Sequence, residues 1–329
     1  MAEEAPRALR SGEVRIRNMA AGICGTDVHI YEGGKGSADV TPPVVLGHEY
    51  AGLVTEVGEG VTTVRVGDRV TVDPNIYCGK CRPCRMGKKQ LCHHLEAVGV
   101  TRDGGFAEYS IVPEGQCFAL RPETDYETAA MAEPLACCLH GIDRAAIAPG
   151  ESVCVIGGGT IGLLMVQLAR LAGAARVGLS EPVEARRQVG RTLGADAVFN
   201  PLEGDFAGAF ADFFGEDGPD VTIECVGNLS AVRQALSLAG RGGRILLFSV
   251  PDPDSEVSVR LFDVYKKELT ILGSFINPDT HRRAVELLDS GRIRTAELIT
   301  HRFPLAELEQ AIVTQKSAES IKVLVLPQK

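Results

Sequence analysis

The most constraining segment of this sequence is a short run of strand-forming residues that ends in a glycine-rich turn. Val153-Cys154-Val155-Ile156 is followed by Gly157-Gly158-Gly159-Thr160-Ile161-Gly162 and then by an apolar helical stretch, Leu163–Leu171. The turn fits the pattern Gly-x-Gly-x-x-Gly, whose glycines allow a tight turn and let a pyrophosphate approach the N-terminus of the helix. We therefore expect Gly157, Gly159, Thr160, Ile161 and Gly162 to bind a dinucleotide.

Strand-like and helical stretches alternate from Pro149 onward, which is typical of a parallel sheet with crossover helices. Six strands fit a doubly wound sheet, and we place them at Ser152–Ile156, Arg176–Ser180, Ala197–Phe199, Val221–Cys225, Arg244–Ser249 and Leu269–Gly273. A helix at about His281 to Asp289 and a last strand, Ile321–Leu326, follow them. The predicted fold class is thus α/β in this part of the chain.

An acidic residue follows the second predicted strand. Glu181 lies 19 residues after Gly162, where a carboxylate binds the 2′-hydroxyl of the adenosine ribose. A carboxylate there repels the 2′-phosphate of NADP, so the sequence favours NAD. Arg186 and Arg187 leave NADP open, because nearby guanidinium groups accept such a phosphate.

The first part of the chain has a different character. Up to about residue 125 it consists of short β stretches cut by Gly and Pro, such as 13–17, 50–57 and 68–72, which predicts a barrel-like all-β domain. A chain of 329 residues also exceeds the usual size of one core. We expect a first domain at 1–145 with a lobe at about 76–94, a dinucleotide-binding domain at 146–277, and a tail at 278–329 that rejoins the first domain.

Four cysteines are crowded into one short stretch. Cys78, Cys81, Cys84 and Cys92 fall within fifteen residues, with gaps that let four thiolates reach one ion. Zinc takes four thiolates in closed structural sites, with no position left for water. The quartet therefore predicts a structural zinc that braces a loop, with an iron–sulfur cluster or an unliganded reduced cluster as the alternatives.

A second set of metal-binding residue types lies upstream of the quartet. A catalytic zinc needs about three N, S or O ligands and one open position. Cys24, His48 and Glu49 meet this requirement, and Glu133 is a further carboxylate in an apolar stretch, as a fourth or exchanging ligand. Asp27 is expected to orient His48.

The composition excludes several classes of protein. The formal charge of −9 argues against a nucleic-acid partner. An N-terminus that carries acids, Met-Ala-Glu-Glu-Ala-Pro-Arg, is unlike a secretory signal, and glycines interrupt the one long uncharged run, 152–169, so we expect no membrane span. We expect a cytoplasmic protein whose ten cysteines stay reduced, so that the clustered ones are ligands and not disulfides.

Together these elements resemble the zinc-containing medium-chain alcohol dehydrogenases, in the branch of the sorbitol, xylitol and threonine dehydrogenases. The resemblance runs from about Gly12 to Leu326 and includes Gly47-His48-Glu49-Tyr50-Ala51-Gly52, Gly104-Gly105-Phe106-Ala107-Glu108-Tyr109 and Thr300-His301-Arg302-Phe303-Pro304-Leu305. It implies a GroES-like catalytic domain, a Rossmann domain, two zinc ions per subunit and a homotetramer, with a dimer as the alternative. The strands at 245–250 and 269–273 are candidates for its interface as well as for the core.

The resemblance also implies a reaction. A secondary alcohol, such as a polyol, gives up its hydroxyl proton to Thr26, which passes it through the nicotinamide ribose towards His29, and hydride goes to NAD to leave a ketone. Catalytic zinc is expected on Cys24 and His48, with Glu49 as a ligand or close neighbour and Glu133 where alcohol dehydrogenases place a second cysteine. Rival interpretations are a threonine dehydrogenase, a general alcohol dehydrogenase, a zinc-free quinone reductase and a zinc-ribbon interaction module with a nucleotide-sensing domain.

Two departures from the family pattern bear on these expectations. The chain lacks most of the first β-hairpin that relatives place before Gly12, which predicts an exposed sheet edge. It also reads Ser274-Phe275-Ile276-Asn277 where mammalian-type sorbitol dehydrogenases carry an Arg-Tyr pair, so sorbitol itself is not implied. Because the quartet is retained, the sequence indicates a microbial-type enzyme whose substrate pocket includes loop 31–41, Phe275 and Asn277.

Overall fold

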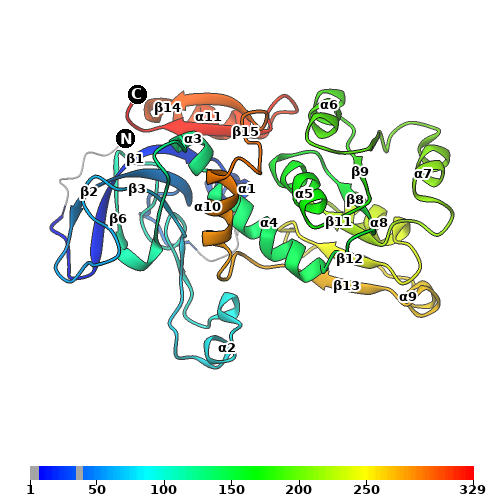
Figure 1. Ribbon diagram of the computed structural model, residues 1–329, viewed down its shortest axis with the longest axis horizontal. Coiled ribbons are helices and arrows are strands. Elements are labelled where there is room, and N and C mark those ends of the chain that lie inside the picture. Colours follow the sequence, from blue (N-terminus) through cyan, green and yellow to red (C-terminus); the bar gives the residue numbers. More distant parts are fainter. Residues whose placement is uncertain (1–6, 35–39) are drawn as a thin grey trace. The chain divides into compact units, whose positions relative to one another are not determined.

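The computed structural model describes residues 7–34 and 40–329, so part of the predicted pocket loop 31–41 lies outside the described residues. The chain divides into two compact units. The first is formed by the chain up to Ala136 together with Asn277–Lys329, and the second by Cys137–Ile276. The chain therefore leaves the first unit once, builds the second, and returns (Figure 1).

A strongly twisted sheet forms the frame of the first unit. Among the described residues it has the strand order β14-β15-β1-β2-β3-β7, with β6 also paired to β1. Its members are β1 (Glu13–Gly22), β2 (Glu49–Val57), β3 (Arg69–Val72), β6 (Tyr109–Pro113), β7 (Cys117–Ala119), β14 (Ile299–Pro304) and β15 (Lys322–Leu326). The sheet thus joins the two ends of the described chain, because β15 pairs antiparallel with β1.

The pattern of β1 explains why this strand lies at the centre of the sheet. Val14 and Ile16 point to one face and are fully buried, whereas Arg15 and Arg17 alternate with them. This period of two is that of a strand with one face on a core. The core on that face also receives valines of neighbouring strands, including Val54, Val70 and Val323.

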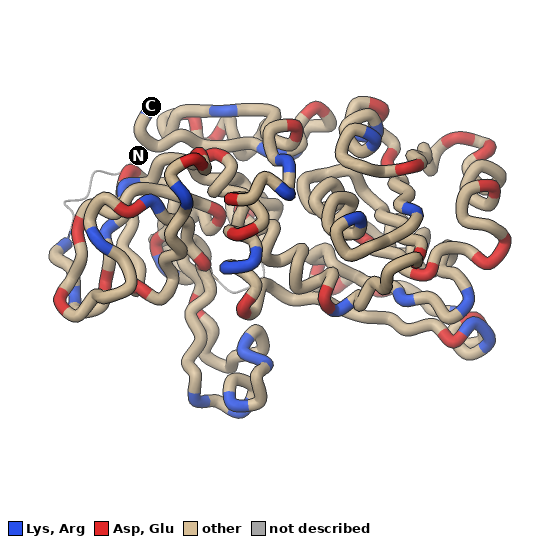
Figure 2. The backbone as a smooth tube through the Cα atoms, in the orientation of Figure 1, with Lys and Arg blue, Asp and Glu red and all other residues tan. Residues whose placement is uncertain are grey.

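Short helices and a projecting lobe complete the first unit. The helices are α1 (Gly25–Tyr31), α3 (Tyr126–Ala129), α10 (His281–Asp289) and α11 (Leu308–Gln315), while α4 (Ala132–Ala145) carries the chain into the second unit. The lobe contains β4 (Asn75–Ile76), α2 (Arg82–Arg85) and β5 (Glu96–Ala97). Figure 2 shows basic residues spread along this lobe, where Lys80, Arg82, Arg85 and Lys88 are exposed.

The second unit is a parallel sheet with the strand order β10-β9-β8-β11-β12-β13. Its strands are β8 (Ser152–Ile156), β9 (Arg176–Ser180), β10 (Ala197–Phe199), β11 (Val221–Glu224), β12 (Arg244–Leu247) and β13 (Thr270–Gly273). Its helices are α5 (Thr160–Leu171), α6 (Glu184–Thr192), α7 (Phe206–Phe214), α8 (Leu229–Leu238) and α9 (Leu261–Lys267). The predicted α/β class with a doubly wound parallel sheet is confirmed.

The strand order of this sheet reverses next to β8. The chain runs outward from β8 to β9 and β10 and then returns to β11 on the other side. Ligands of such sheets bind outside the carboxyl ends of the strands at the point of reversal. The glycine-rich turn after Ile156 lies at that place.

Candidate metal centres and dinucleotide site

The four lobe cysteines converge as the spacing predicts. Their sulfur atoms all lie within 4.8 Å of one another, with Cys81 Sγ 3.4 Å from Cys84 Sγ and 3.9 Å from Cys92 Sγ. Sulfurs that bind one tetrahedral zinc are about 3.8 Å apart, given a Zn–S bond of about 2.3 Å. The four thiols therefore fit a closed zinc site.

Backbone amides prepare these thiols for a cation. The amide N–H groups of Cys81 and His94 point at Cys78 Sγ and Cys92 Sγ at 3.4 and 3.3 Å. Backbone hydrogen bonds of this kind lower the pKa of Cys81 to about 6. A thiolate is the form that binds metal, so these amides favour the ligand form of Cys78 and Cys81, whereas burial raises the pKa of Cys84.

A second donor group forms in the first unit from two separate segments. Cys24 precedes α1, whereas His48 directly precedes β2 and Glu49 is its first residue. One donor atom from each of these residues lies within 4.8 Å of the other two, and His48 and Glu49 are buried. Gly47 brings the second segment in at a φ of +95°, where a side chain would collide with Phe106.

Asp27 connects the two segments. Its carboxylate is fully buried, and Oδ2 accepts a hydrogen bond from Cys24 N at 2.8 Å while Oδ1 lies 3.4 Å from His48 Nδ1. Burial opposes protonation of His48, but Asp27 and Cys24 outweigh it and raise the pKa of His48 well above its usual range. The cluster thus attracts a positive charge, as a site for a metal cation must.

A lysine outside the predicted site residues completes this cluster. Lys322, the first residue of β15, forms a buried ion pair with Glu49, and Lys322 Nζ donates a hydrogen bond to Ile23 O at 3.0 Å. The only signal in the sequence was one charged residue in the apolar run Ile321-Lys322-Val323-Leu324-Val325-Leu326.

The other predicted catalytic residues, Thr26, His29 and Glu133, lie on two different helices. Thr26 is half-buried in the first turn of α1, and His29 is exposed one turn later on the same helix. Glu133 is buried in the first turn of α4 and does not belong to the group of donor atoms around Cys24 and His48.

In the second unit the glycine-rich turn has the tight geometry that its sequence predicts. Gly157 has a φ of +100°, and a Cβ on Gly162 would lie 1.7 Å from Gly157 O. By contrast, nothing lies within 4 Å of a Cβ on Gly159, which precedes α5. Thr160 and Ile161 form the first turn of α5.

Glu181 lies against this turn. Its carboxylate is buried and accepts hydrogen bonds from Gly158 N at 2.6 Å and Val183 N at 2.8 Å. Arg187 is buried as well, and its guanidinium donates to Glu181 O and Pro182 O at 2.8 and 2.7 Å. Arg186 is half-buried on α6. The carboxylate of Glu181 therefore lies beside the turn, and the guanidinium of Arg187 is hydrogen-bonded to backbone carbonyl groups.

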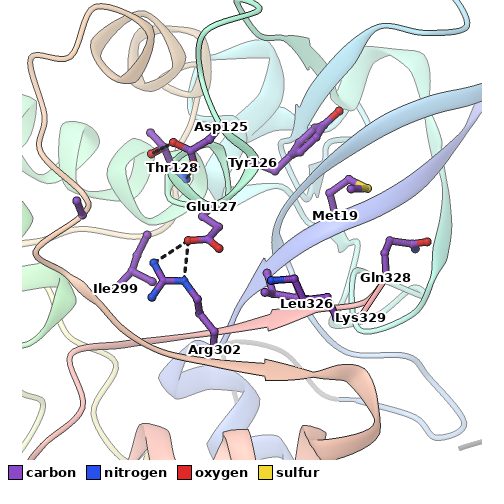
Figure 3. A pocket seen from close by; sticks show the side chains of 11 residues that line it. Met19, Asp125, Tyr126, Glu127, Thr128, Ile299, Arg302, Leu326, Gln328 and Lys329 are labelled. Carbon is purple, nitrogen blue, oxygen red and sulfur yellow. Dashed lines mark hydrogen bonds and ion pairs between the residues drawn. The ribbon is translucent and has the colours of Figure 1, made fainter.

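A cavity of about 430 Å³ in the first unit is separate from both donor groups, because none of their residues lines it. Figure 3 shows the ion pair of Glu127 and Arg302 within it, with Met19, Tyr126 and Leu326 around the pair. Over the described ranges, the helices are too short or too polar for any of them to cross a lipid bilayer.

Comparison with known proteins gives consistent matches over nearly the whole chain. Residues 10–122 match the alcohol dehydrogenase GroES-like domain and residues 160–290 the zinc-binding dehydrogenase domain. An L-threonine 3-dehydrogenase of Caldanaerobacter subterraneus is 36% identical over 96% of this chain and 91% of its own length. A sorbitol dehydrogenase of Halalkalibacterium halodurans is 35% identical over 96% of this chain and 92% of its own length.

A solved structure extends this likeness to three dimensions. A protein assigned to the zinc-binding dehydrogenases of Sinorhizobium meliloti 1021, with NADP bound, is 43% identical and superposes with a TM-score of 0.93. The match covers 98% of this chain and 94% of that one.

Proposed function

This chain belongs to the zinc-dependent medium-chain dehydrogenases, in the branch with sorbitol and threonine dehydrogenases, and from that premise we propose that it oxidises a secondary alcohol of the polyol type to a ketone with NAD. Family membership confirms the resemblance predicted from the sequence, together with the GroES-like and Rossmann-type domains and the oxidoreductase class. The observation that carries the proposal is the convergence of Cys24, His48 and Glu49.

The resident metal of this centre is proposed to be zinc, held by Cys24 and His48. A thiolate and an imidazole are zinc ligands, and Asp27 accepts a hydrogen bond from Cys24 N and lies 3.4 Å from His48 Nδ1. Zinc bound there would supply a Lewis acid that favours loss of the substrate's hydroxyl proton. Glu133 remains a proposed further ligand, and the four lobe cysteines are proposed to hold the second, structural zinc.

Proton transfer is proposed to use α1. Thr26 carries a hydroxyl one turn before His29, and the two lie on a helix that begins directly after Cys24. His29 is exposed, so its ring exchanges protons with water. The helix therefore offers a route from the half-buried threonine to solvent.

The proposed cofactor is NAD, although NADP is bound to the solved relative described above. Glu181 places a buried carboxylate beside the glycine-rich turn, where the 2′-phosphate of NADP would add negative charge to negative charge. Arg187, one of the two nearby cations, already binds backbone carbonyl groups. Arg186 is the guanidinium proposed to contact the cofactor.

The substrate is proposed to be a polyol, with threonine as the second candidate because a threonine dehydrogenase is 36% identical. One residue of the predicted pocket has a structural role instead: Asn277 is fully buried, accepts a hydrogen bond from Asn75 Nδ2 at 2.5 Å and donates one to Asp73 Oδ1 at 3.2 Å. Specificity is therefore expected to depend on residues other than Asn277.

A cytoplasmic location and an assembly of several copies are also proposed. All ten cysteines are described, and none is in a disulfide, which fits a reducing cytoplasm. A homotetramer is proposed, with a dimer as the alternative.

The decisive experiment removes one ligand of the catalytic centre. Cys24→Ala and His48→Ala are each expected to lower the zinc content from two ions per chain to one and to abolish alcohol-dependent NADH formation, while NAD binding is retained. Cys117→Ala, at a half-buried thiol outside both donor groups, is the matched control and should keep both zinc ions. Full activity in Cys24→Ala or His48→Ala would refute the proposal.

A substrate panel then separates the candidates. Threonine, short alcohols, pentitols, hexitols and cyclitols are each tested with NAD and with NADP. Highest kcat/KM on a pentitol or hexitol with NAD is expected, whereas highest kcat/KM on threonine would assign the second candidate.

A further inference from the structure

A fully buried carboxylate lies at the end of β11 in the second unit. Glu224 is the last residue of that strand and is 0% exposed. It accepts hydrogen bonds from Val226 N at 2.7 Å and from Gly227 N at 2.8 Å, and the hydroxyl of Ser249 also donates to it. Burying an ionised carboxylate is costly unless such bonds compensate it. One side chain therefore joins the loop after β11 to the loop after β12.

The two joined loops lie at the edge of the sheet where a dinucleotide binds. The strand order β10-β9-β8-β11-β12-β13 is that of a sheet built from two mononucleotide-binding halves. The half from β8 to β10 carries the glycine-rich turn and Glu181, which fit the pyrophosphate and the adenosine ribose. The other half begins with β11 and β12, so the loops after these strands are available to the nicotinamide end of the cofactor.

These loops also expose apolar side chains next to the glycine-rich turn. Val226 and Val250 are each 47% exposed. A Cβ on Gly157 would lie 2.6 Å from Val226 Cγ2, so Val226 lies directly against the turn. Gly227, at a φ of +88°, brings the first loop close to the second, since its Cβ would lie 3.3 Å from Val250 O. Apolar side chains in this place suit one face of a nicotinamide ring.

We propose that Glu224 is a positioning residue of the cofactor site, whose carboxylate sets the place of Val226 and Val250 for the nicotinamide ring. Because it is fully buried, it acts through the two loops and not by contact with the cofactor. The inference rests on the proposed function for the identity of the cofactor. It assigns to Glu224, in the nicotinamide half, the loop-fixing part that Glu181 has in the adenosine half.

The test compares two ligands of the full-length, zinc-loaded protein by titration calorimetry: NADH, and ADP-ribose, which lacks the nicotinamide ring. In Glu224→Ala the amides of Val226 and Gly227 lose their acceptor and the loops are released from each other. The Kd for NADH should rise about tenfold or more, whereas the Kd for ADP-ribose should change by no more than about twofold.

Glu224→Gln is the conservative variant. Its oxygen can accept from the two amides, and its amide group can donate to the hydroxyl of Ser249. The Kd for NADH should therefore stay within about threefold of the wild-type value, because the loops remain joined without the charge.

Two other carboxylates of the same unit are the controls. Glu216→Ala, at an exposed side chain, should change neither Kd. Glu181→Gln should weaken NADH and ADP-ribose alike, since both ligands contain the adenosine ribose. The two glutamates of the cofactor site are thus expected to give different patterns with the same pair of ligands.

Equal weakening of NADH and ADP-ribose in Glu224→Ala overturns the inference, as does unchanged binding of NADH. If that variant does not fold, Ser249→Ala, which removes one donor to the carboxylate, is judged by the same comparison: a Kd that rises more for NADH than for ADP-ribose supports the inference, and any other result overturns it. A wild-type protein without alcohol-dependent NADH formation would refute the proposed function, whereas wild-type turnover with parallel losses of both ligands in Glu224→Ala would refute this inference alone.

Discussion

At the scale of single residues, the carboxylate of Glu181 both accepts hydrogen bonds from the backbone and offers acceptors to a ligand. One oxygen accepts from Gly158 N, which holds the glycine-rich turn, and the other accepts from Val183 N, which starts α6. Each oxygen keeps lone pairs for further donors, such as the hydroxyl groups of a ribose. The same group therefore shapes the turn and selects its ligand.

Glu181→Gln tests this dual role. A carboxamide has one acceptor oxygen, so one of the two backbone amides or the ribose loses its partner, and we expect the KM for NAD to rise about tenfold or more. The preference for NAD over NADP should shrink, because the negative charge is gone. Initial rates with both cofactors measure this. Glu184→Gln, at an exposed carboxylate three residues further on, is the control; equal KM values in the two variants would contradict the role of Glu181.

Asp73 is a second buried carboxylate, and its raised pKa predicts that the stability of the folded protein depends on pH. Burial raises the pKa of Asp73 to about 6, although Asn75 and Asn277 donate hydrogen bonds to it. The folded state thus keeps a proton that the unfolded state loses near pH 4, so this group makes the protein less stable as pH rises from 4 to 6. The loss amounts to about 3 kcal/mol above pH 6.

Asp73→Asn should remove that loss. The new Oδ1 can accept the same two hydrogen bonds without a charge. We expect equal stability of variant and wild type near pH 4 and a variant that is more stable at pH 8, by about 3 kcal/mol in denaturant unfolding. Asp254→Asn, on an exposed loop, should show no such difference. A variant less stable than wild type at pH 8 would show that the charge of Asp73 is stabilising.

At the scale of elements, the turn between β8 and α5 depends on two glycines for different reasons. Gly162 allows α5 to approach Gly157 O, and Gly159 leaves open space in front of the helix N-terminus. The first is required by the fold itself, and the second by a ligand that approaches the backbone.

Substitution by alanine should separate these two requirements. Gly162→Ala is expected to distort the turn and to lower the melting temperature of the protein without cofactor, because its Cβ would collide with Gly157 O. Gly159→Ala should fold with an unchanged melting temperature and bind NAD at least about tenfold more weakly. Calorimetry of the cofactor-free protein and NAD titration give the two readouts. Equal melting temperatures for both variants would contradict this division.

How far these elements could be predicted from the sequence depends on the distance between partners. The turn at Gly157–Gly162 and the quartet at Cys78–Cys92 are local patterns, so spacing alone predicts their geometry. The pairing of Glu49 with Lys322 depends on the register of β1, β2 and β15, which no local pattern contains. The hydrogen bonds of Asn277, which was predicted to line a pocket, could not be foreseen for the same reason. Its buried partners Asp73 and Asn75 lie about two hundred positions away in the sequence.

At the scale of the whole molecule, charge and apolar surface are unevenly distributed. The chain carries a formal charge of −9, yet the lobe around the quartet is basic (Figure 2). In the second unit, exposed apolar side chains gather near one edge of the sheet. We define the α9 patch as Leu261, Phe262 and Tyr265, which are 79%, 67% and 80% exposed. Both β12 and β13 lie in segments predicted as interface candidates, but of these two strands only β13 is at an edge of the sheet.

The α9 patch and the edge of β13 predict how two copies assemble. An edge strand offers unpaired N–H and C=O groups, and β13 also exposes Ile271, so a second copy can pair with it antiparallel across a two-fold axis. Phe and Tyr are enriched at such interfaces.

The double variant Phe262→Glu with Tyr265→Glu would bury charge at this interface. We expect it to halve the mass in solution measured by light scattering, or to reduce it further to the 35.0 kDa of one chain. Leu202→Glu, at an isolated residue 81% exposed, should leave the mass unchanged. A double variant with the wild-type mass would place the interface elsewhere, because two buried carboxylates at the centre of a contact are not tolerated without loss of affinity.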